Sequence, residues 1–254
     1  MTAGLLFMSF TVGLMVGLTS MGGAALMTPF LILVVGVRPV LAVGTDLVYG
    51  SLTKIAGALM HWKQGTVDVK VCFRMGLGSV PGGILGVLIV TRLHRSGVDI
   101  DYWVRHALGV TLLIVALLVV AKAMGYEIPS RKTSWILKHR ETATVAWGAF
   151  VGFAVGLTSV GSGSLIAPFL LIIMPGSSTA RVIGTDVFHA ALLVSATAFV
   201  HQQAGNVDWN LVPTLLCGSI PGVLIGSYLA PRLPERALRF GLAALLFATG
   251  WKLV

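Results

Sequence analysis

Charged residues are scarce in this 254-residue chain. Asp, Glu, Lys and Arg together make up 11% of it, and hydrophobic residues make up 56%. A soluble domain averages about 25% charged residues, so this composition cannot supply the polar surface that a water-soluble protein of this size needs. The mean hydropathy of +0.92 indicates instead that most of the surface faces lipid, as in an all-α membrane protein.

Other absences exclude further classes of function. The chain has two cysteines, Cys72 and Cys217, and their positions give neither a metal-ligand spacing nor a disulfide framework. We expect them to be small packing residues, and we expect no metal or other cofactor. No nucleotide-binding motif is present, and no nucleophile is paired with a base in a recognisable pattern. The sequence therefore predicts that the protein is not an enzyme.

The net charge of +9 would suggest nucleic acid as a partner in a soluble protein. Here the basic residues lie mostly between apolar segments, where they contact lipid headgroups and set orientation. No basic stripe carries aromatic stacking partners, so we expect no nucleic-acid binding.

The chain repeats itself. Four landmarks recur in one order, with a one-residue slip between the first and the second: Gly13–Leu31 returns as Gly152–Leu170, Val43–Leu47 as Ile183–Val187, His61–Asp68 as His201–Asp208, and Gly78–Gly86 as Gly218–Gly226. Two copies of one helical unit in one apolar chain are typical of secondary transporters. We divide the chain into a first transmembrane repeat (1–124), a linker (125–141) and a second repeat (142–254).

Each repeat contains about five hydrophobic segments. They cover about 5–19, 24–36, 43–62, 70–91 and 104–124 in the first repeat, and about 143–158, 164–175, 183–201, 209–230 and 236–253 in the second. A full span needs about 20 residues, and the first two segments of each repeat are shorter. Uncharged turns join these two segments, so we expect short or re-entrant helices whose turns lie inside the membrane. The alternative is a pair of ordinary short spans joined by a neutral surface turn.

Either interpretation gives an odd number of crossings per repeat, so the second repeat enters the membrane upside down relative to the first. The larger share of Lys and Arg falls on the side of the central linker. By the positive-inside rule, we expect a multi-pass protein of the cytoplasmic (inner) membrane, with the linker cytoplasmic and both termini outside.

The two turns are candidate anion sites. Their residues are Thr19, Ser20, Gly22 and Gly23 in the first repeat, and Thr158, Ser159, Gly161, Ser162 and Gly163 in the second. Glycine lets backbone approach a ligand, hydroxyls donate to oxygen anions, and the following helix offers unpaired N–H groups. The alternative is that these small residues only allow close helix packing. We predict substrate-binding turns whose tips converge near the midplane.

The third segment of each repeat carries an acidic residue. Asp46 and Asp186 follow Thr45 and Thr185 at the start of long apolar runs. They are either helix caps near a surface, or coupling and gating groups that carry a proton or another cation.

Two residues near these carboxylates differ between the repeats. Lys54 shares a helix face with Asp46, and its counterpart is Val194. His189 lies one turn from Asp186, and its counterpart is Tyr49. We predict that Lys54 and His189 contribute to substrate binding and tune its specificity.

Two further pairs are interpreted structurally. His61 and His201 flank segment ends and are expected to be interfacial anchors. The ridges Gly78-x3-Gly82-x3-Gly86 and Gly218-x3-Gly222-x3-Gly226 are expected to pack helices closely.

These motifs resemble those of the TauE/SafE family, the sulfite exporters. The resemblance rests on G-L-T-S-x-G, on G-T-D, and on H-x3-G-x-V-D followed by G-S-x-P-G-x3-G, all present twice. It implies transport of small anions, mainly sulfur oxyanions and organosulfonates such as sulfite, thiosulfate and sulfoacetate. A secondary transporter with alternating access, coupled to a proton or sodium, is the leading hypothesis, and a passive anion channel on the same fold is the alternative. The oligomeric state stays open.

Overall fold

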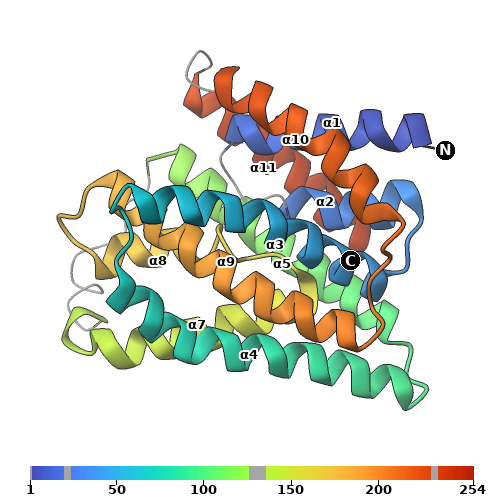
Figure 1. Cartoon of the computed structure of the whole chain (residues 1–254), viewed down its shortest axis with the longest axis horizontal. Coiled ribbons are helices and arrows are strands. Elements are labelled where there is room, and N and C mark those ends of the chain that lie inside the picture. The colour runs from blue at the N-terminus through green and yellow to red at the C-terminus, as the bar shows by residue number, and fades with distance from the viewer. Residues whose placement is uncertain (1, 20–23, 126–135, 230–233) are drawn as a thin grey trace.

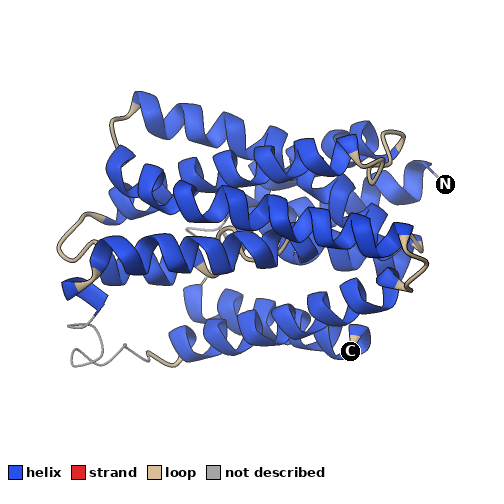
Figure 2. Ribbon diagram, turned by 90° about the horizontal axis from the view of Figure 1, so that it is seen from below, coloured by secondary structure: helices blue, strands red, loops and turns tan. Residues whose placement is uncertain are grey.

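The computed structural model of the chain describes residues 2–19, 24–125, 136–229 and 234–254. Regular structure in these residues is entirely helical, and Figure 2 shows no strand among them. The helices run roughly along one direction, and their connecting loops gather toward the two ends of the bundle (Figure 2). This architecture agrees with the all-α membrane class predicted from composition.

Every predicted segment corresponds to a helical element. The first repeat contains α1 (Thr2–Thr19), α2 (Ala24–Phe30), the π-helix η1 (Leu31–Val35), α3 (Pro39–Lys63), α4 (Val69–Arg95) and α5 (Ile100–Ala123). The second repeat contains α7 (Arg140–Thr158), α8 (Ile166–Ile173), α9 (Thr179–Gln203), α10 (Leu211–Leu229) and α11 (Glu235–Leu253). The second segment of each repeat is short, as predicted, whereas α1 and α7 have 18 and 19 residues and are longer than the sequence indicated.

Four described helices have the length and apolar composition of a membrane span: Val69–Leu93, Ile100–Ala123, Thr179–Gln203 and Leu211–Leu229. Helix α3 has the same 25-residue length as its counterpart α9, but it contains Lys54 and Lys63 as well as Asp46. The chain is therefore a multi-pass membrane protein that carries charged side chains within its helices α3 and α9.

The two repeats are joined by two helix pairs, and each pair takes one helix from each repeat. Helix α4 packs along α7, and α10 packs along α1 (Figure 1). A Cβ atom added at Gly82 would meet the backbone of Ala149, and one added at Gly222 would meet the backbone of Phe10. The glycine ridges thus allow close helix packing, as predicted, and each ridge packs on the first helix of the other repeat.

Helices α3 and α9 lie side by side between these pairs (Figure 1). Gly50 faces Val194, and Gly57 faces Val187, so the residue number rises along α3 while it falls along α9. The two equivalent helices are therefore antiparallel neighbours. The same holds for α5 and α11, where Arg105 donates to the carbonyl of Lys252 at 3.0 Å and Gly250 approaches Leu112 and Leu113.

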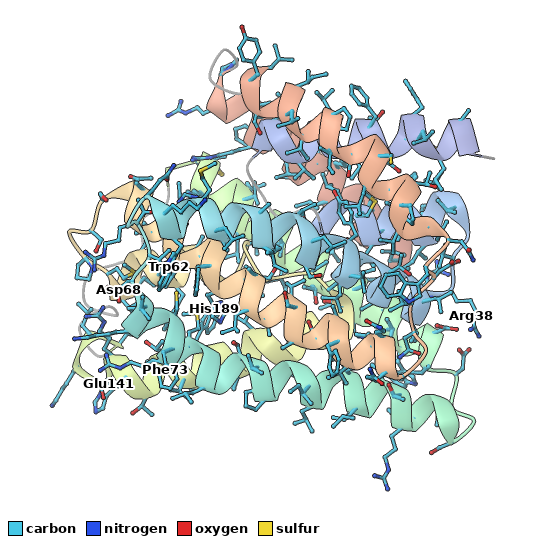
Figure 3. All side chains as sticks on the ribbon, viewed as in Figure 1. Arg38, Trp62, Asp68, Phe73, Glu141 and His189 are labelled. Atoms are coloured by element: carbon cyan, nitrogen blue, oxygen red, sulfur yellow. The ribbon has the colours of Figure 1, made fainter. Side chains whose placement is uncertain are left out.

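Charged side chains gather at the two ends of the bundle. Asp68 and Glu141 lie at one end and Arg38 at the other (Figure 3). Asp68 pairs with Arg181 at 3.1 Å, and Glu141 pairs with Arg74. Arg74 and Arg181 therefore lie at one end of the bundle and Arg38 at the other, as the orientation prediction requires. Which of the two ends is cytoplasmic stays a prediction.

Candidate functional site

Asp46 and Asp186 lie about two turns inside their helices, not at the helix ends. Helix α3 begins at Pro39 after the N-cap Arg38, and α9 begins after the N-cap Ser178. The side chain of Ser178 accepts a hydrogen bond from the backbone N–H of Arg181 at 3.3 Å. The capping interpretation of the two aspartates is therefore wrong, which leaves two carboxylates within the helical core.

The Asp46 carboxylate joins segments of both repeats. Asp46 has no exposed surface, and its Oδ2 accepts hydrogen bonds from Thr28 Oγ1 at 2.5 Å and from Ser159 Oγ at 2.8 Å. Thr28 lies on α2, and Ser159 lies in the turn after α7. Oδ1 has no hydrogen-bond partner among the described residues. We call Thr28, Asp46 and Ser159 the Asp46 site.

The turn after α7 has an unusual backbone. Ser159 has a φ of 63°, the only positive value at a non-glycine residue in the described chain, and Gly161 has a φ of 118°. Ser159 closes α7 through a bond from its N–H to the carbonyl of Val155 at 2.7 Å. A left-handed serine costs free energy, and the bond from its hydroxyl to Asp46 helps to hold it.

The predicted donors of this turn differ in availability. The Thr158 hydroxyl donates to the carbonyl of Ala154 at 2.8 Å, and the Ser159 hydroxyl is bonded to Asp46. The N–H groups of Gly161, Ser162 and Gly163 have no acceptor within the described part of the chain. Ser162 is 2% exposed and precedes α8, whose N-terminal dipole end favours an anion. The backbone and Ser162 are thus the available donors here.

The equivalent turn of the first repeat falls mostly outside the described residues. Thr19 is the last residue of α1, and Ser20, Gly22 and Gly23 belong to the undescribed segment 20–23. Convergence of the two turns therefore stays a prediction.

Lys54 lies between the two carboxylates. It follows Asp46 by eight residues on α3, a rise of about 12 Å, and α9 brings Asp186 to the far side. Lys54 interacts electrostatically with Asp186 first and with Asp46 second. No ion pair within 4.0 Å joins it to a described residue, so its ammonium group is available to a ligand.

His189 faces the same region with an unpaired nitrogen. Its ring has no exposed surface and lies among the helices (Figure 3). Nε2 is 2.8 Å from Ser79 Oγ on α4, and Lys54 interacts with the ring electrostatically. Neither Nδ1 of His189 nor Oδ1 of Asp186 has a partner among the described residues. This half of the interior therefore holds Lys54 and two buried polar atoms without partners.

Thr45 and Thr185 form a symmetric pair of links between the repeats. Thr45 Oγ1 donates to the carbonyl of Leu41 at 2.7 Å and accepts from the N–H of Asp208 at 2.9 Å. Thr185 Oγ1 donates to the carbonyl of Arg181 at 2.7 Å and accepts from the N–H of Asp68 at 2.9 Å. Each hydroxyl thus fixes its helix to a loop of the other repeat.

The sequence interpretation missed three features. Thr28 was not singled out, because its counterpart in the repeat is Ala167. Ser79 lies next to the glycine ridge of α4 and was not selected as a site residue. His201 is fully buried and lies 3.1 Å from the carbonyl of Gly156, so its assignment as an interfacial anchor is wrong. His61 is partly exposed and bonds to Thr66 at 3.0 Å.

Known proteins similar to this chain are membrane transporters by name. A family model described as "Sulfite exporter TauE/SafE" matches residues 5–253. The "Probable membrane transporter protein YjnA" of Bacillus subtilis (strain 168) is 40% identical over 256 residues, which cover 100% of both chains. The "Probable membrane transporter protein YunE" of the same strain is 26% identical over 96% of this chain and 93% of its own.

A third relative has a similar name. A "Probable membrane transporter protein" of Xylella fastidiosa (strain Temecula1 / ATCC 700964) is 29% identical over 87% of this chain and 82% of its own. No solved structure matches the chain.

Proposed function

The chain belongs to the TauE/SafE family, and we propose that it is a secondary transporter that moves a small anion across the cytoplasmic membrane by alternating access. The substrate class is a sulfur oxyanion or an organosulfonate of the sulfite, thiosulfate or sulfoacetate type. The observation that carries the proposal is the buried contact between Ser159 of one repeat and Asp46 of the other. This contact places the break between α7 and α8 beside the buried carboxylate of Asp46. Transporters commonly build their binding sites at such breaks in membrane helices.

The anion is held by groups that donate hydrogen bonds or carry positive charge. The N–H groups of Gly161 to Gly163 and the Ser162 hydroxyl supply hydrogen bonds at the start of α8, while Thr158 and Ser159 shape the turn. Lys54 supplies a charge that has no ion pair among the described residues. His189 presents Nδ1 toward the same interior. Such a set binds oxyanions through charge-assisted hydrogen bonds.

The first repeat contributes the matching turn. We propose that Thr19, Ser20, Gly22 and Gly23 complete the site from the other membrane face, by the same chemistry. Asp46 and Asp186 are the coupling or gating carboxylates, with a proton or sodium as the coupled ion. Thr45 and Thr185 transmit movement between the repeats, because each bonds to a loop of the opposite repeat.

Alternating access follows from an inverted repeat. The antiparallel pairing of α3 with α9 and of α5 with α11 supports this inversion. We propose that the linker 125–141 is cytoplasmic and that both termini are outside, since Arg74 and Arg181 lie at the opposite end from Arg38. The repeats then exchange between outward and inward states by rocking about the central helices.

The test uses purified protein in proteoliposomes. We expect saturable uptake of sulfite, thiosulfate or sulfoacetate, accelerated when unlabelled anion is trapped inside, because exchange requires a carrier and not a channel. The Ser20→Ala/Ser159→Ala variant should lose at least about tenfold in affinity, because Ser20 no longer donates to the anion and the turn after α7 loses its bond to Asp46; hydrogen bonds to charged groups contribute about 1.5–3 kcal/mol each. The control is Thr11→Ala, whose exposed hydroxyl bonds only within α1. Unchanged affinity in the double variant would refute the proposed site, and uptake without exchange would favour a channel.

A further inference from the structure

The two repeat-related carboxylates have different surroundings. Asp46 accepts from the hydroxyls of Thr28 and Ser159, whereas Asp186 interacts foremost with Lys54. The difference lies in the sequence, because the counterpart of Thr28 is Ala167 and the counterpart of Lys54 is Val194. Asp46 thus accepts two hydroxyl hydrogen bonds, whereas the main charged neighbour of Asp186 is Lys54.

On the basis of the proposed transport function, we propose that Asp46, held by Thr28 and Ser159, carries the one coupling proton of the cycle, and that Asp186 stays charged as the partner of Lys54. This assignment gives the two related aspartates separate roles and fixes the stoichiometry at one proton for each anion.

The geometry of the Asp46 site can accommodate a proton. Its carboxylate oxygen Oδ2 lies 2.5 and 2.8 Å from the two hydroxyl oxygens, which is direct hydrogen-bonding distance. A proton needs only one free carboxylate oxygen, and Oδ1 of Asp46 is buried without a partner among the described residues. The three oxygens need not move to accept it.

The groups that face Asp46 leave no competing proton carrier in contact with its carboxylate. On its own helix these are Tyr49 and, two turns away, Lys54. Thr28 comes from α2 and Ser159 from the turn after α7. Four further polar groups come from neighbouring helices and loops, and each has a contact other than Asp46. His201 of α9 is bonded to Gly156, and Ser219 of α10 faces Tyr49. Asp208 bonds to the N–H of Asn210, and Asp101 of α5 bonds to the N–H of Val40.

Charge balance explains why the proton accompanies the anion. With Asp46 ionised, the interior charges of Asp46, Lys54 and Asp186 sum to one negative charge, which repels an incoming anion. A proton taken from the solution onto Asp46 Oδ1 removes that charge, and Lys54 and Asp186 then balance each other. The same proton leaves Oδ1 for the opposite solution after the anion has been released. Every cycle therefore moves one proton in the direction of the anion.

The experiment compares two aspartate variants in proteoliposomes with 35S-labelled thiosulfate and 14C-labelled sulfoacetate. The wild type should accumulate the probe at least tenfold when the outside is acidic, whatever the sodium gradient. Asp46→Asn holds the site in its neutral form, so its uptake should no longer respond to the pH gradient and should stop when the probe concentrations on the two sides are equal. Asp186→Asn should keep its response to the pH gradient while uptake slows at least tenfold, because the charge of Lys54 then lacks the counter-charge of Asp186.

A flux measurement on the wild type needs no variant. An internal pH dye together with the labelled anion should report one proton for each anion. A ratio of two, accumulation by Asp46→Asn, or uptake driven by sodium alone would each overturn the proton assignment while leaving the transport function intact. If the wild type moves neither probe, the proposed function fails instead.

Discussion

The two repeats share a scaffold but differ at the site. The crossings of α4 with α7 and of α10 with α1 use matching glycines, and Thr45 and Thr185 bond to equivalent loops at the same 2.9 Å distance. The surroundings of the carboxylates, in contrast, differ at Thr28, Lys54 and His189, whose counterparts are Ala167, Val194 and Tyr49. Symmetry was retained where helices must fit, and lost where a ligand is proposed to bind.

This comparison predicts two kinds of variant. Substitutions in the shared scaffold should have equal effects in both repeats. Substitutions around the carboxylates should have unequal effects, even at positions that the repeat makes equivalent.

The largest effect is expected at the helix crossings. A valine at Gly152 would push its Cβ into the backbone of Ser79, and one at Gly13 would do the same at Ser219. Because backbone cannot move aside as a side chain can, each variant should lose about 3 kcal/mol of stability, the upper end of the usual cost of overpacking, and yield little monodisperse protein on size-exclusion chromatography. Gly4→Val is the control, since no atom lies within 4 Å of its added Cβ. Tolerance of one crossing variant but not the other would contradict the shared scaffold.

Lys54 should show the largest effect on function. Lys54→Met removes the central positive charge and should weaken anion binding about 30-fold, equivalent to about 2 kcal/mol, in equilibrium binding of labelled thiosulfate. Val194→Met changes the equivalent position without changing charge and should alter affinity less than about threefold. Equal losses at the two positions would show that packing, and not charge, determines the affinity.

Ser79 and Ser219 should also differ. Ser79 is bonded to the buried ring of His189, whereas Ser219 Oγ has no partner within hydrogen-bonding geometry among the described residues. Ser79→Ala should cost about 1.5 kcal/mol, because an imidazole nitrogen loses its partner, and Ser219→Ala less than about 0.5 kcal/mol. Thermal unfolding in detergent measures both, and a reversed order would contradict the assigned contacts.

The two threonine links should respond alike. Thr45→Val and Thr185→Val each remove one cross-repeat hydrogen bond, and each should cost about 1 kcal/mol of unfolding free energy. Thr249→Val is a matched control, because its hydroxyl bonds only within α11. A cost at one link without a cost at the other would mean that the repeats are held together on one side only.

The smallest effect is expected at the partly exposed ion pair between Asp68 and Arg181. Asp68→Asn should cost less than about 1 kcal/mol, and the difference from the wild type should shrink in high salt. Thermal unfolding at low and high ionic strength measures this change. A larger, salt-independent loss would assign the pair a structural role.

The sequence predicted the scaffold because its signals are duplicated. Gly82 and Gly222 recur in matched ridges, and the short second segment of each repeat follows a break rich in glycine and serine. Start signals for the central helices were also present, since Pro39 occupies the first helical position and Ser178 is an N-cap. These signals place Asp46 inside its helix. Because both aspartates stand at the start of apolar runs, however, the sequence alone did not decide whether they cap their helices.

The contacts of the site could not be predicted from duplication. Thr28 has no hydroxyl counterpart, so comparison of the repeats gives no reason to select it. The partner of Asp46 is the turn of the other repeat, and that pairing depends on how α7 packs along α4. The polar neighbour Gln202 suggested an interfacial position for His201, but the helix turns the ring of His201 inward to Gly156.

The most direct test of the central claim, that an anion binds at the buried turn beside Asp46, is chemical labelling of Ser162→Cys in a Cys72→Ser/Cys217→Ser background. Ser162 is 2% exposed, so the charged sulfonate reagent (2-sulfonatoethyl) methanethiosulfonate can reach it only when the site opens. We predict modification in both right-side-out and inside-out vesicles, slowed at least fivefold by thiosulfate or sulfoacetate. Modification from neither side, or at a rate that no anion changes, would contradict the account.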